Sequence, residues 1–271
     1  MHVAKVFKFY LVSFIAAALL FLTASSCFAD VDEKAFSAAQ KRQIEGVVHD
    51  YLIANPEILI EVSMALKHKQ MDDMKINALK VAKENAKTIF STAHSPAIGN
   101  PEGKITIVEF YDYYCPHCRD MELILADLMK SNKEIRVVEK ILPIFGERSQ
   151  FAAKIALAAD MQNKFDKMQA ILMNSKNISL LMSADYQQKV YDLAQKAGLN
   201  VKKLKDDMIN KAISAEIDAN YALAGKLLPN QIATPIFIVG KSDLTDKEKI
   251  KFFVGAVEKE KLNAAIKGLG A

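Results

Sequence analysis

The sequence lacks the short motifs that identify several large enzyme classes. It contains no Gly-x-Ser-x-Gly, as in serine hydrolases, and no His-Glu-x-x-His, as in zinc proteases. The tripeptide Gly240-Lys241-Ser242 resembles the end of a phosphate-binding loop, but Pro235 stands where that loop needs its leading glycine. The sequence therefore gives no support for these hydrolases or for a nucleotide-binding protein of the P-loop type.

The chain also lacks a large excess of charge of one sign. Its 36 basic and 32 acidic residues give a formal net charge of +4, and both kinds are interspersed along its 271 residues. A nucleic-acid-binding domain concentrates basic residues on one face. We therefore expect no nucleic acid among the partners and interpret most charged residues as solvated helix faces.

Long apolar runs are scarce, and the longest lies at the N-terminus. Lys5 and Lys8 precede an apolar run from Phe9 to Leu22, and small residues follow as far as Ala29. This pattern predicts a secretory signal peptide over residues 1–29. A transmembrane anchor is the alternative, but the run is shorter than the roughly 20 residues that a spanning helix needs. We expect the mature protein to be exported.

Cysteine is scarce too, and this limits the metal sites that the chain can form. Cys27 lies in the predicted signal peptide and would be removed with it, unless it is lipidated and holds the protein at the outer membrane or surface. Cys115 and Cys118 remain. A zinc site would need a second cysteine pair or nearby histidines, and the other histidines beyond residue 29 all lie before residue 95. We therefore expect no metal.

Cys115-Pro116-His117-Cys118 lies between an expected strand and an expected helix. At a helix start, free backbone N–H groups and the helix dipole stabilise a thiolate, which lowers the pKa of Cys115. Pro116 fits the first helical turn, and His117 adds partial positive charge. A stable thiolate makes the disulfide oxidising. We predict that Cys115 exchanges disulfides with a substrate, that Cys118 resolves the mixed disulfide, and that no cofactor is needed beyond this cysteine pair. The alternative is a purely structural disulfide, but it would close a loop too short to stabilise the fold much.

Hydrophobic patterns predict an α/β fold. The expected order after the arm is strand, helix, strand, a helical block and a closing strand pair with a final helix. The expected strands are Ile105–Tyr111, Ile135–Ile141, Pro235–Val239 and Lys251–Val254, and the last helix runs from about Glu258 to Lys267. We interpret residues 94–271 as a thioredoxin-like domain with a helical insertion at about 149–227.

Residues 30–93 are expected to form helices that precede this domain. One stripe of a first helix carries Ile44, Val47, Val48, Tyr51 and Leu52, and a second helix extends from about Pro56 towards Phe90 with few apolar residues in its second half. We predict an N-terminal helical oligomerisation arm and stalk. The alternative is a helical extension that packs against its own domain.

The segment Glu109-Phe110-Tyr111-Asp112-Tyr113-Tyr114-Cys115-Pro116-His117-Cys118 resembles the DsbA family of bacterial periplasmic disulfide oxidoreductases, whose catalytic dipeptide is typically Pro-His. The resemblance runs from about Ser95 to the C-terminus. It implies a periplasmic location, unfolded or misoxidised exported proteins as substrates, and a membrane redox partner that recycles the active site. The arm resembles those of larger, oligomeric members, which implies a homo-oligomer, a dimer or a trimer, and isomerase activity beside oxidase activity.

The resemblance also implies further site residues. Thr234-Pro235 matches the family's cis-proline loop, which binds substrate backbone beside the active site. Glu109, Glu122 and Lys140 fall where the family carries charged groups near the buried cysteine. The resemblance implies that Glu109 accepts a proton from that cysteine and that Glu122 and Lys140 act as a proton relay.

A function of another class is compatible with the same sequence. A non-catalytic envelope or surface protein could use the same fold, with its apolar arm, to bind or chaperone other proteins. Replacement of Cys115 separates the two hypotheses, because only an enzyme would lose activity.

Overall fold

The computed structural model describes residues 36–229 and 231–270. The predicted signal peptide and Cys27 therefore lie outside the described residues. The chain divides into two compact units, Met1–Leu66 and Lys67–Ala271.

Two helices begin the described part of the chain, α2 (Ala38–Ala54) and α3 (Glu57–Glu84). Ser37 and Gln40 form a capping box at the start of α2, in which each side chain accepts a hydrogen bond from the other's backbone N–H group. Within the described residues, no side chain of α2 is buried. Four residues of its predicted apolar stripe, Ile44, Val47, Val48 and Tyr51, are between 44% and 69% exposed, and the fifth, Leu52, is half-buried. The stripe is thus an unpartnered apolar surface.

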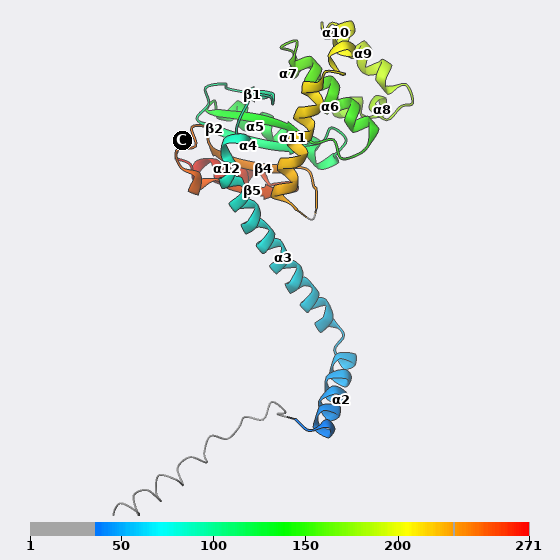
Figure 1. The fold of residues 1–271 in the computed structure, drawn as a ribbon, viewed down its shortest axis with the longest axis vertical. Coiled ribbons are helices and arrows are strands. Elements are labelled where there is room, and N and C mark those ends of the chain that lie inside the picture. The colour runs from blue at the N-terminus through cyan, green and yellow to red at the C-terminus, as the bar shows by residue number, and fades with distance from the viewer. Residues whose placement is uncertain (1–35, 230, 271) are drawn as a thin grey trace, which may run out of the picture. The chain divides into compact units, whose positions relative to one another are not determined.

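The second unit is built on a five-stranded sheet of order β1-β3-β2-β4-β5 (Figure 1). The strands are β1 (Ala97–Gly99), β2 (Ile105–Tyr111), β3 (Ile135–Ile141), β4 (Ile236–Lys241) and β5 (Lys251–Val254). β2 and β3 are parallel and joined by helix α5 (Pro116–Ser131), whereas the other neighbouring pairs are antiparallel. The α/β arrangement predicted from the sequence is confirmed, with β2, β3 and β5 at the predicted bounds.

Side chains alternate between the two faces of the sheet. Ile107 and Val137 point to the face that is covered by α5 and the last helix, α12 (Lys259–Lys267). Val108 and Val138 point to the opposite face. The end of α3, the short helix α4 (Ala86–Ile89) and part of α11 (Lys211–Leu227) cover that second face. Odd-numbered residues of β2 and β3 therefore face α5 and α12, and even-numbered residues face α3, α4 and α11.

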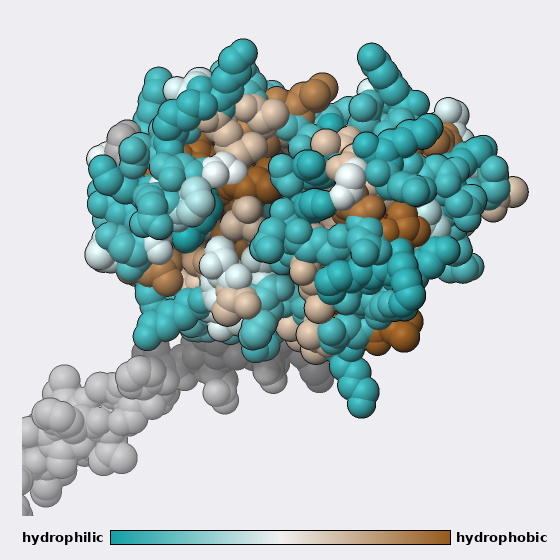
Figure 2. Space-filling view, turned by 90° about the horizontal axis from the view of Figure 1, so that it is seen from above, coloured by the Kyte–Doolittle hydropathy of each residue, from teal (hydrophilic) through white to brown (hydrophobic). Residues whose placement is uncertain are grey.

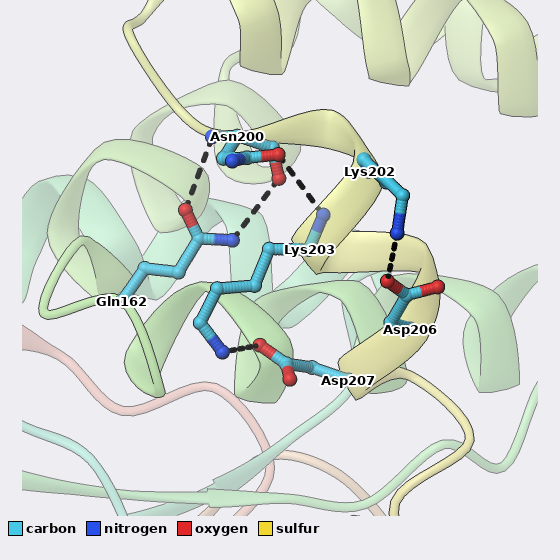
Figure 3. A network of polar contacts seen from close by, with 6 residues as sticks. All are labelled: Gln162, Asn200, Lys202, Lys203, Asp206 and Asp207. Atoms are coloured by element: carbon cyan, nitrogen blue, oxygen red, sulfur yellow. Dashed lines mark hydrogen bonds and ion pairs between the residues drawn. The ribbon is translucent and has the colours of Figure 1, made fainter.

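The segment between β3 and β4 forms the predicted helical block. Its helices are α6 (Glu147–Asp160), α7 (Phe165–Met173), η2 (Ser175–Asn177), α8 (Ile178–Leu181), α9 (Tyr186–Lys196), α10 (Val201–Asp207) and α11. Asn200 caps α10, because its side chain accepts a hydrogen bond from the Lys203 backbone N–H, and its backbone forms two hydrogen bonds with the Gln162 side chain (Figure 3). Lys202–Asp206 and Lys203–Asp207 ion pairs follow on the same helix. These contacts tie the α6–α7 turn to α10.

The C-terminal end of the predicted stalk packs into the core of the second unit. Ala82, Ala86, Ile89 and Phe90 are buried with Phe110 of β2. Charged residues are frequent in this part of the predicted arm, which runs to residue 93. The alanines among them allow α3 and α4 to lie close to the sheet, so this stretch belongs to the second unit.

The face of the molecule that Figure 2 shows is mainly hydrophilic. Seen from above, apolar side chains gather in a furrow between two raised parts (Figure 2). Within residues 36–229 and 231–270, no helix has both the length and the apolar character to cross a bilayer.

Candidate active site

The two cysteines lie at the start of α5, directly after the loop that leaves β2. Cys115 is the N-cap residue, with an extended backbone, and Pro116 takes the first helical position. Cys115 is 2% exposed and Cys118 is fully buried, whereas Pro116 and His117 are exposed between them. Both cysteines are free thiols. Because Cys115 has little contact with solvent, its charge state depends on neighbouring protein groups.

Those neighbours favour the thiolate of Cys115. A hydrogen bond from the Cys118 thiol is the largest contribution and lowers the pKa of Cys115 to about 6, against the opposing effect of burial. The Thr234 side chain and the backbone N–H groups of Cys118 and His117 also contribute to this lowered pKa. Thiolate, rather than thiol, is the nucleophile in disulfide exchange. At neutral pH Cys115 is therefore in its reactive form.

Cys118 has the opposite character. Burial raises its pKa far above the usual range, and the hydrogen bond to Cys115 and the charge of Glu109 raise it further. It remains a thiol at neutral pH and must exchange a proton within the protein whenever its bond to Cys115 opens or closes. The two sulfurs are thus chemically different, although they are only one helical turn apart.

The segment before β4 meets the cysteines from another part of the chain. The Thr234–Pro235 peptide bond is cis, as the resemblance implied. The Cys115 thiol donates a hydrogen bond of 3.5 Å to the backbone carbonyl oxygen of Thr234. The Thr234 hydroxyl oxygen is buried and has no partner among the residues that the structure describes, so it is available to the Cys115 thiolate.

Glu109 lies near both cysteines, and two further carboxyl groups lie near Glu109. Glu109 on β2 and Glu122 on α5 were predicted from the sequence, and the structure adds Glu139 on β3, which is paired with Glu109 in the parallel register. Burial raises the pKa of Glu109, and the negative charges of Glu139, Glu122 and Cys115 raise it further. Burial also raises the pKa of Glu122, which is half-buried. Sequence reasoning missed Glu139 because only the strand register brings it here.

The predicted position of Lys140 is wrong. Its neighbour Glu139 faces the cysteines, so strand alternation turns Lys140 to the other face of the sheet. There its ammonium group donates a 2.6 Å hydrogen bond to the Ser95 hydroxyl and lies 3.9 Å from the Glu216 carboxylate. All three side chains are buried. Lys140 therefore joins a buried polar cluster that the sheet separates from the cysteines.

Asp112 is a second residue that the sequence analysis did not select. Its buried carboxylate accepts hydrogen bonds from the backbone N–H groups of Tyr114, Ile144 and Phe145 and from the Ser149 hydroxyl, at 2.6 to 3.1 Å. Burial raises the pKa of Asp112, and these bonds oppose that effect. Asp112 thereby fixes the loop before Cys115 to the loop before α6. An aspartate two residues before a turn N–H is the sequence signal for such a bond.

A pocket of about 540 Å³ lies beside the cysteines, between α5 and the helices α7 and α8. Pro116, Arg119, Glu122 and exposed Leu123 line one side, and Met182 is among the apolar residues of the other. A substrate segment at Cys115 would have access to this pocket. Within the part of the chain that the structure describes, no three histidine, cysteine, aspartate or glutamate side chains are arranged to hold a metal ion.

Comparison with known proteins finds two curated Rickettsia proteins that are similar to this chain. The Rickettsia conorii protein named "Putative protein-disulfide oxidoreductase RC0029" is 27% identical over 184 residues, which cover 66% of this chain and 62% of that protein. A Rickettsia prowazekii protein with the corresponding name is 26% identical over 145 residues, or 53% of its length. The chain thus spans between half and two thirds of the length of these curated relatives.

Two solved structures share the fold. A thioredoxin-like oxidoreductase from Silicibacter pomeroyi DSS-3 is 34% identical, with a TM-score of 0.57, and the match covers 68% of this chain and 96% of that one. BcfH from Salmonella enterica Typhimurium is 25% identical, with a TM-score of 0.67, and the match covers 86% of this chain and 97% of that one. The second match extends into the N-terminal helices.

Family models match both units of the chain. The model described as "Copper resistance protein ScsC N-terminal domain" matches residues 40–72, within α2 and α3. The model described as "Thioredoxin" matches residues 91–259, more than half of the chain, and includes both cysteines and the Thr234–Pro235 segment. The thioredoxin-like fold expected from the sequence is confirmed, and the chain belongs to the thioredoxin family.

Proposed function

We propose that this protein is an exported thiol-disulfide oxidoreductase that forms and rearranges disulfide bonds in other exported proteins through Cys115 and Cys118. The observation that carries the proposal is that the pKa values of the two thiols at one helix start are shifted in opposite directions. The pKa of Cys115 is lowered to about 6, whereas the pKa of Cys118 is raised. The names of the Rickettsia relatives support the same activity.

The oxidase reaction follows from this difference. A substrate thiolate attacks the Cys115 sulfur of the Cys115–Cys118 disulfide, that disulfide bond breaks, and the Cys118 sulfur leaves with the electron pair and takes up a proton. A second substrate thiol loses its proton and attacks the substrate sulfur of the mixed disulfide, and Cys115 leaves as a thiolate. The substrate has lost two electrons, and the active site has gained them.

The isomerase reaction uses the same residues from the reduced state. The Cys115 thiolate attacks a wrong substrate disulfide and is later displaced by another substrate thiolate, so no net electrons are transferred. The Thr234 backbone beside Pro235 and the pocket at Pro116 would hold the substrate segment. We propose that unfolded or misoxidised exported proteins are the substrates and that a membrane redox partner reoxidises the active site.

The N-terminal helices support an oligomer. The exposed apolar stripe of α2, defined by Ile44, Val47, Val48 and Tyr51, has the pattern of a helix that packs against another helix. We propose that it joins copies of this chain into a dimer or a trimer. The signal-like segment 1–29 supports export to the periplasm.

Trapping the mixed disulfide tests the proposed function. Cys118→Ala should retain a substrate on Cys115 as a covalent complex that dithiothreitol releases, whereas Cys115→Ala should trap none. Refolding of a reduced disulfide protein and repair of a scrambled one should both require Cys115. If Cys115→Ala retains these activities, the protein acts by binding alone, and the non-catalytic chaperone hypothesis replaces this one.

A further inference from the structure

Glu109 and Glu139 form a buried carboxyl pair. They are partners in the parallel register of β2 and β3, so their side chains leave the sheet on the same face. Glu109 is 1% exposed, and Glu139 is fully buried. Over residues 36–229 and 231–270, none of their four carboxyl oxygens has a hydrogen-bond partner. A buried charge without a partner is costly, so this pair strongly favours holding protons.

The groups that face the pair supply no compensating positive charge. They are Tyr111 from β2, Tyr113 from the following loop, and Cys115, Cys118 and Glu122 from α5. Each is neutral or negative at neutral pH. Lys140, the cation beside Glu139 in the sequence, is engaged by Ser95 and Glu216 on the other face of the sheet.

The nearby hydroxyl donors are also engaged elsewhere. The Tyr111 hydroxyl donates to the side-chain oxygen of Gln169 at 2.9 Å, and the Tyr113 hydroxyl donates to the same oxygen at 2.6 Å. The Gln169 amide nitrogen donates to Glu122 at 3.4 Å. These bonds hold the two tyrosines and Glu122 in place. None of them is a hydrogen bond to a carboxyl oxygen of Glu109 or Glu139.

Like charge then determines how the pair titrates. Burial raises the pKa of Glu109, and the charge of Glu139 raises it further. Burial also raises the pKa of Glu139; the charge of Glu122 adds to this rise, and the Tyr111 hydroxyl opposes it. Two adjacent buried carboxyls without a cation do not ionise together near neutral pH. At least one of the two therefore keeps a proton.

We propose that Glu139 is a positioning residue that keeps a proton on Glu109, so that Glu109 donates it to the Cys118 sulfur when the Cys115–Cys118 disulfide opens. The inference rests on the proposed function and adds a residue to that site. In the step, substrate thiolate bonds to Cys115, the disulfide bond breaks, and the Cys118 thiolate takes the Glu109 proton to become a thiol. The carboxyl pair is left with one proton fewer and regains it from solvent.

This arrangement favours one direction of the exchange. A protonated pair promotes departure of Cys118, which is the step that donates a disulfide. The same pair is a poor base for removing the proton of Cys118, so Cys118 resolves a mixed disulfide slowly. The substrate then has time to displace Cys115 with its own second thiol, as both oxidation and isomerisation require.

The pH dependence of disulfide opening tests the proposal on the full chain. We would measure the rate at which glutathione opens the Cys115–Cys118 disulfide, expressed per glutathione thiolate, in wild type, Glu139→Gln and Glu109→Gln. In wild type the rate should stay constant and then fall at high pH, as the pair loses its last proton. In Glu139→Gln the fall should move to lower pH by about one unit or more. Glu109→Gln should lose the fall and be about 10-fold slower below it.

A matched control and a second measurement complete the test. Glu134→Gln, a half-exposed glutamate just before β3, should leave the profile unchanged. An identical inflection in wild type and Glu139→Gln overturns the proposal. The infrared carbonyl band of protonated carboxyls in wild type at neutral pH should weaken in Glu139→Gln, and absence of the band in wild type also overturns it. If glutathione fails to open the wild-type disulfide at any pH, the proposed function fails instead, and the band still reports on the pair.

Discussion

The Cys115 sulfur lies 3.5 Å from the backbone carbonyl oxygen of Thr234, the residue directly before Pro235. A segment 119 residues further along the chain thereby meets the N-cap of α5. The carbonyl accepts a bond from the thiol, whereas the buried Thr234 hydroxyl can donate to the thiolate. The same residue therefore contacts both protonation states of Cys115, but only its hydroxyl favours the charged one.

Thr234→Val removes that donor and keeps the shape of the side chain. The loss of a hydrogen bond to a charged sulfur should raise the pKa of Cys115 by about one unit from its value near 6. The rate of iodoacetamide alkylation against pH measures this value in the reduced protein. Thr88→Val, at an exposed position of α4, is the control and should not shift the curve. An unshifted curve in Thr234→Val would assign the low pKa to the helix start and Cys118 alone.

The lowered pKa of Cys115 should make the reduced protein more stable as the pH rises. Below about pH 6 Cys115 is a thiol in both the folded and the unfolded chain and contributes nothing. Between pH 6 and about 8.5, the usual pKa of an unfolded thiol, the unfolded chain binds the extra proton, so the free energy of unfolding rises with pH. The contribution is complete above that range and is lost as the pH falls through about 6.

Urea unfolding of the reduced protein measures this effect. The difference in unfolding free energy between wild type and Cys115→Ala should increase from pH 5 to pH 8, because other titrating groups are common to both. Cys118 titrates in the unfolded chain only near the upper end of this window, since its folded pKa is raised. A difference that stays constant between pH 5 and pH 8 would contradict the assignment of the thiolate.

Asp112→Ala should destabilise the protein more than most surface changes do. The change leaves three backbone N–H groups and the Ser149 hydroxyl without their acceptor in a buried place. We expect a loss of about 2–4 kcal/mol in the free energy of unfolding. Chemical denaturation would measure it against Asp243→Ala, whose carboxylate accepts only local bonds from Thr245 in an exposed turn. Equal losses in the two variants would show that Asp112 does not fix the loops.

Lys140→Met should separate stability from chemistry. It leaves the Glu216 carboxylate in a buried site without its cation, which should cost about 3–5 kcal/mol of stability. Because the sheet lies between Lys140 and the cysteines, the pH profile of glutathione exchange should be the same as in wild type. A profile that moves in Lys140→Met but not in Lys249→Met, an exposed lysine, would restore Lys140 to the proton relay.

The sequence predicted those features that depend on local chemistry. Ile105–Tyr111 and Ile135–Ile141 are dense in β-branched residues, and such short apolar runs form buried strands. The position of Cys115 at a helix start follows equally from the proline after it.

The features that the sequence did not predict depend on which residues, distant in the chain, pack against one another in the fold. Glu139 and Lys140 are adjacent charged residues in one strand, and only the register with β2 decides which of them meets Glu109. The sequence left open whether the end of the predicted arm packs against its own domain, for a related reason. Ala82 and Ala86 are weak signals of hydrophobicity, but their small size allows a helix to approach the sheet closely.

Truncation of the chain at two positions tests where the arm ends. A chain that begins at Lys67 lacks the exposed apolar stripe of α2 but keeps the buried residues Ala82 to Phe90. It should be a folded monomer in sedimentation, whereas the mature protein should be an oligomer. A chain that begins at Ser95 should lose more than about 4 kcal/mol of stability, because Ile89 and Phe90 leave the core.

Single substitutions in the arm separate these two effects in the mature protein. Val47→Asp, in the exposed stripe, should dissociate the oligomer and leave the unfolding of the second unit unchanged. Gln43→Asp, an exposed polar position of the same helix, is the control for the added charge. Repair of scrambled disulfides should fall with dissociation if two active sites must reach one substrate, while opening of the Cys115–Cys118 disulfide by glutathione should stay constant. An oligomer that survives both Val47→Asp and the start at Lys67 would place the interface in the second unit, away from the arm.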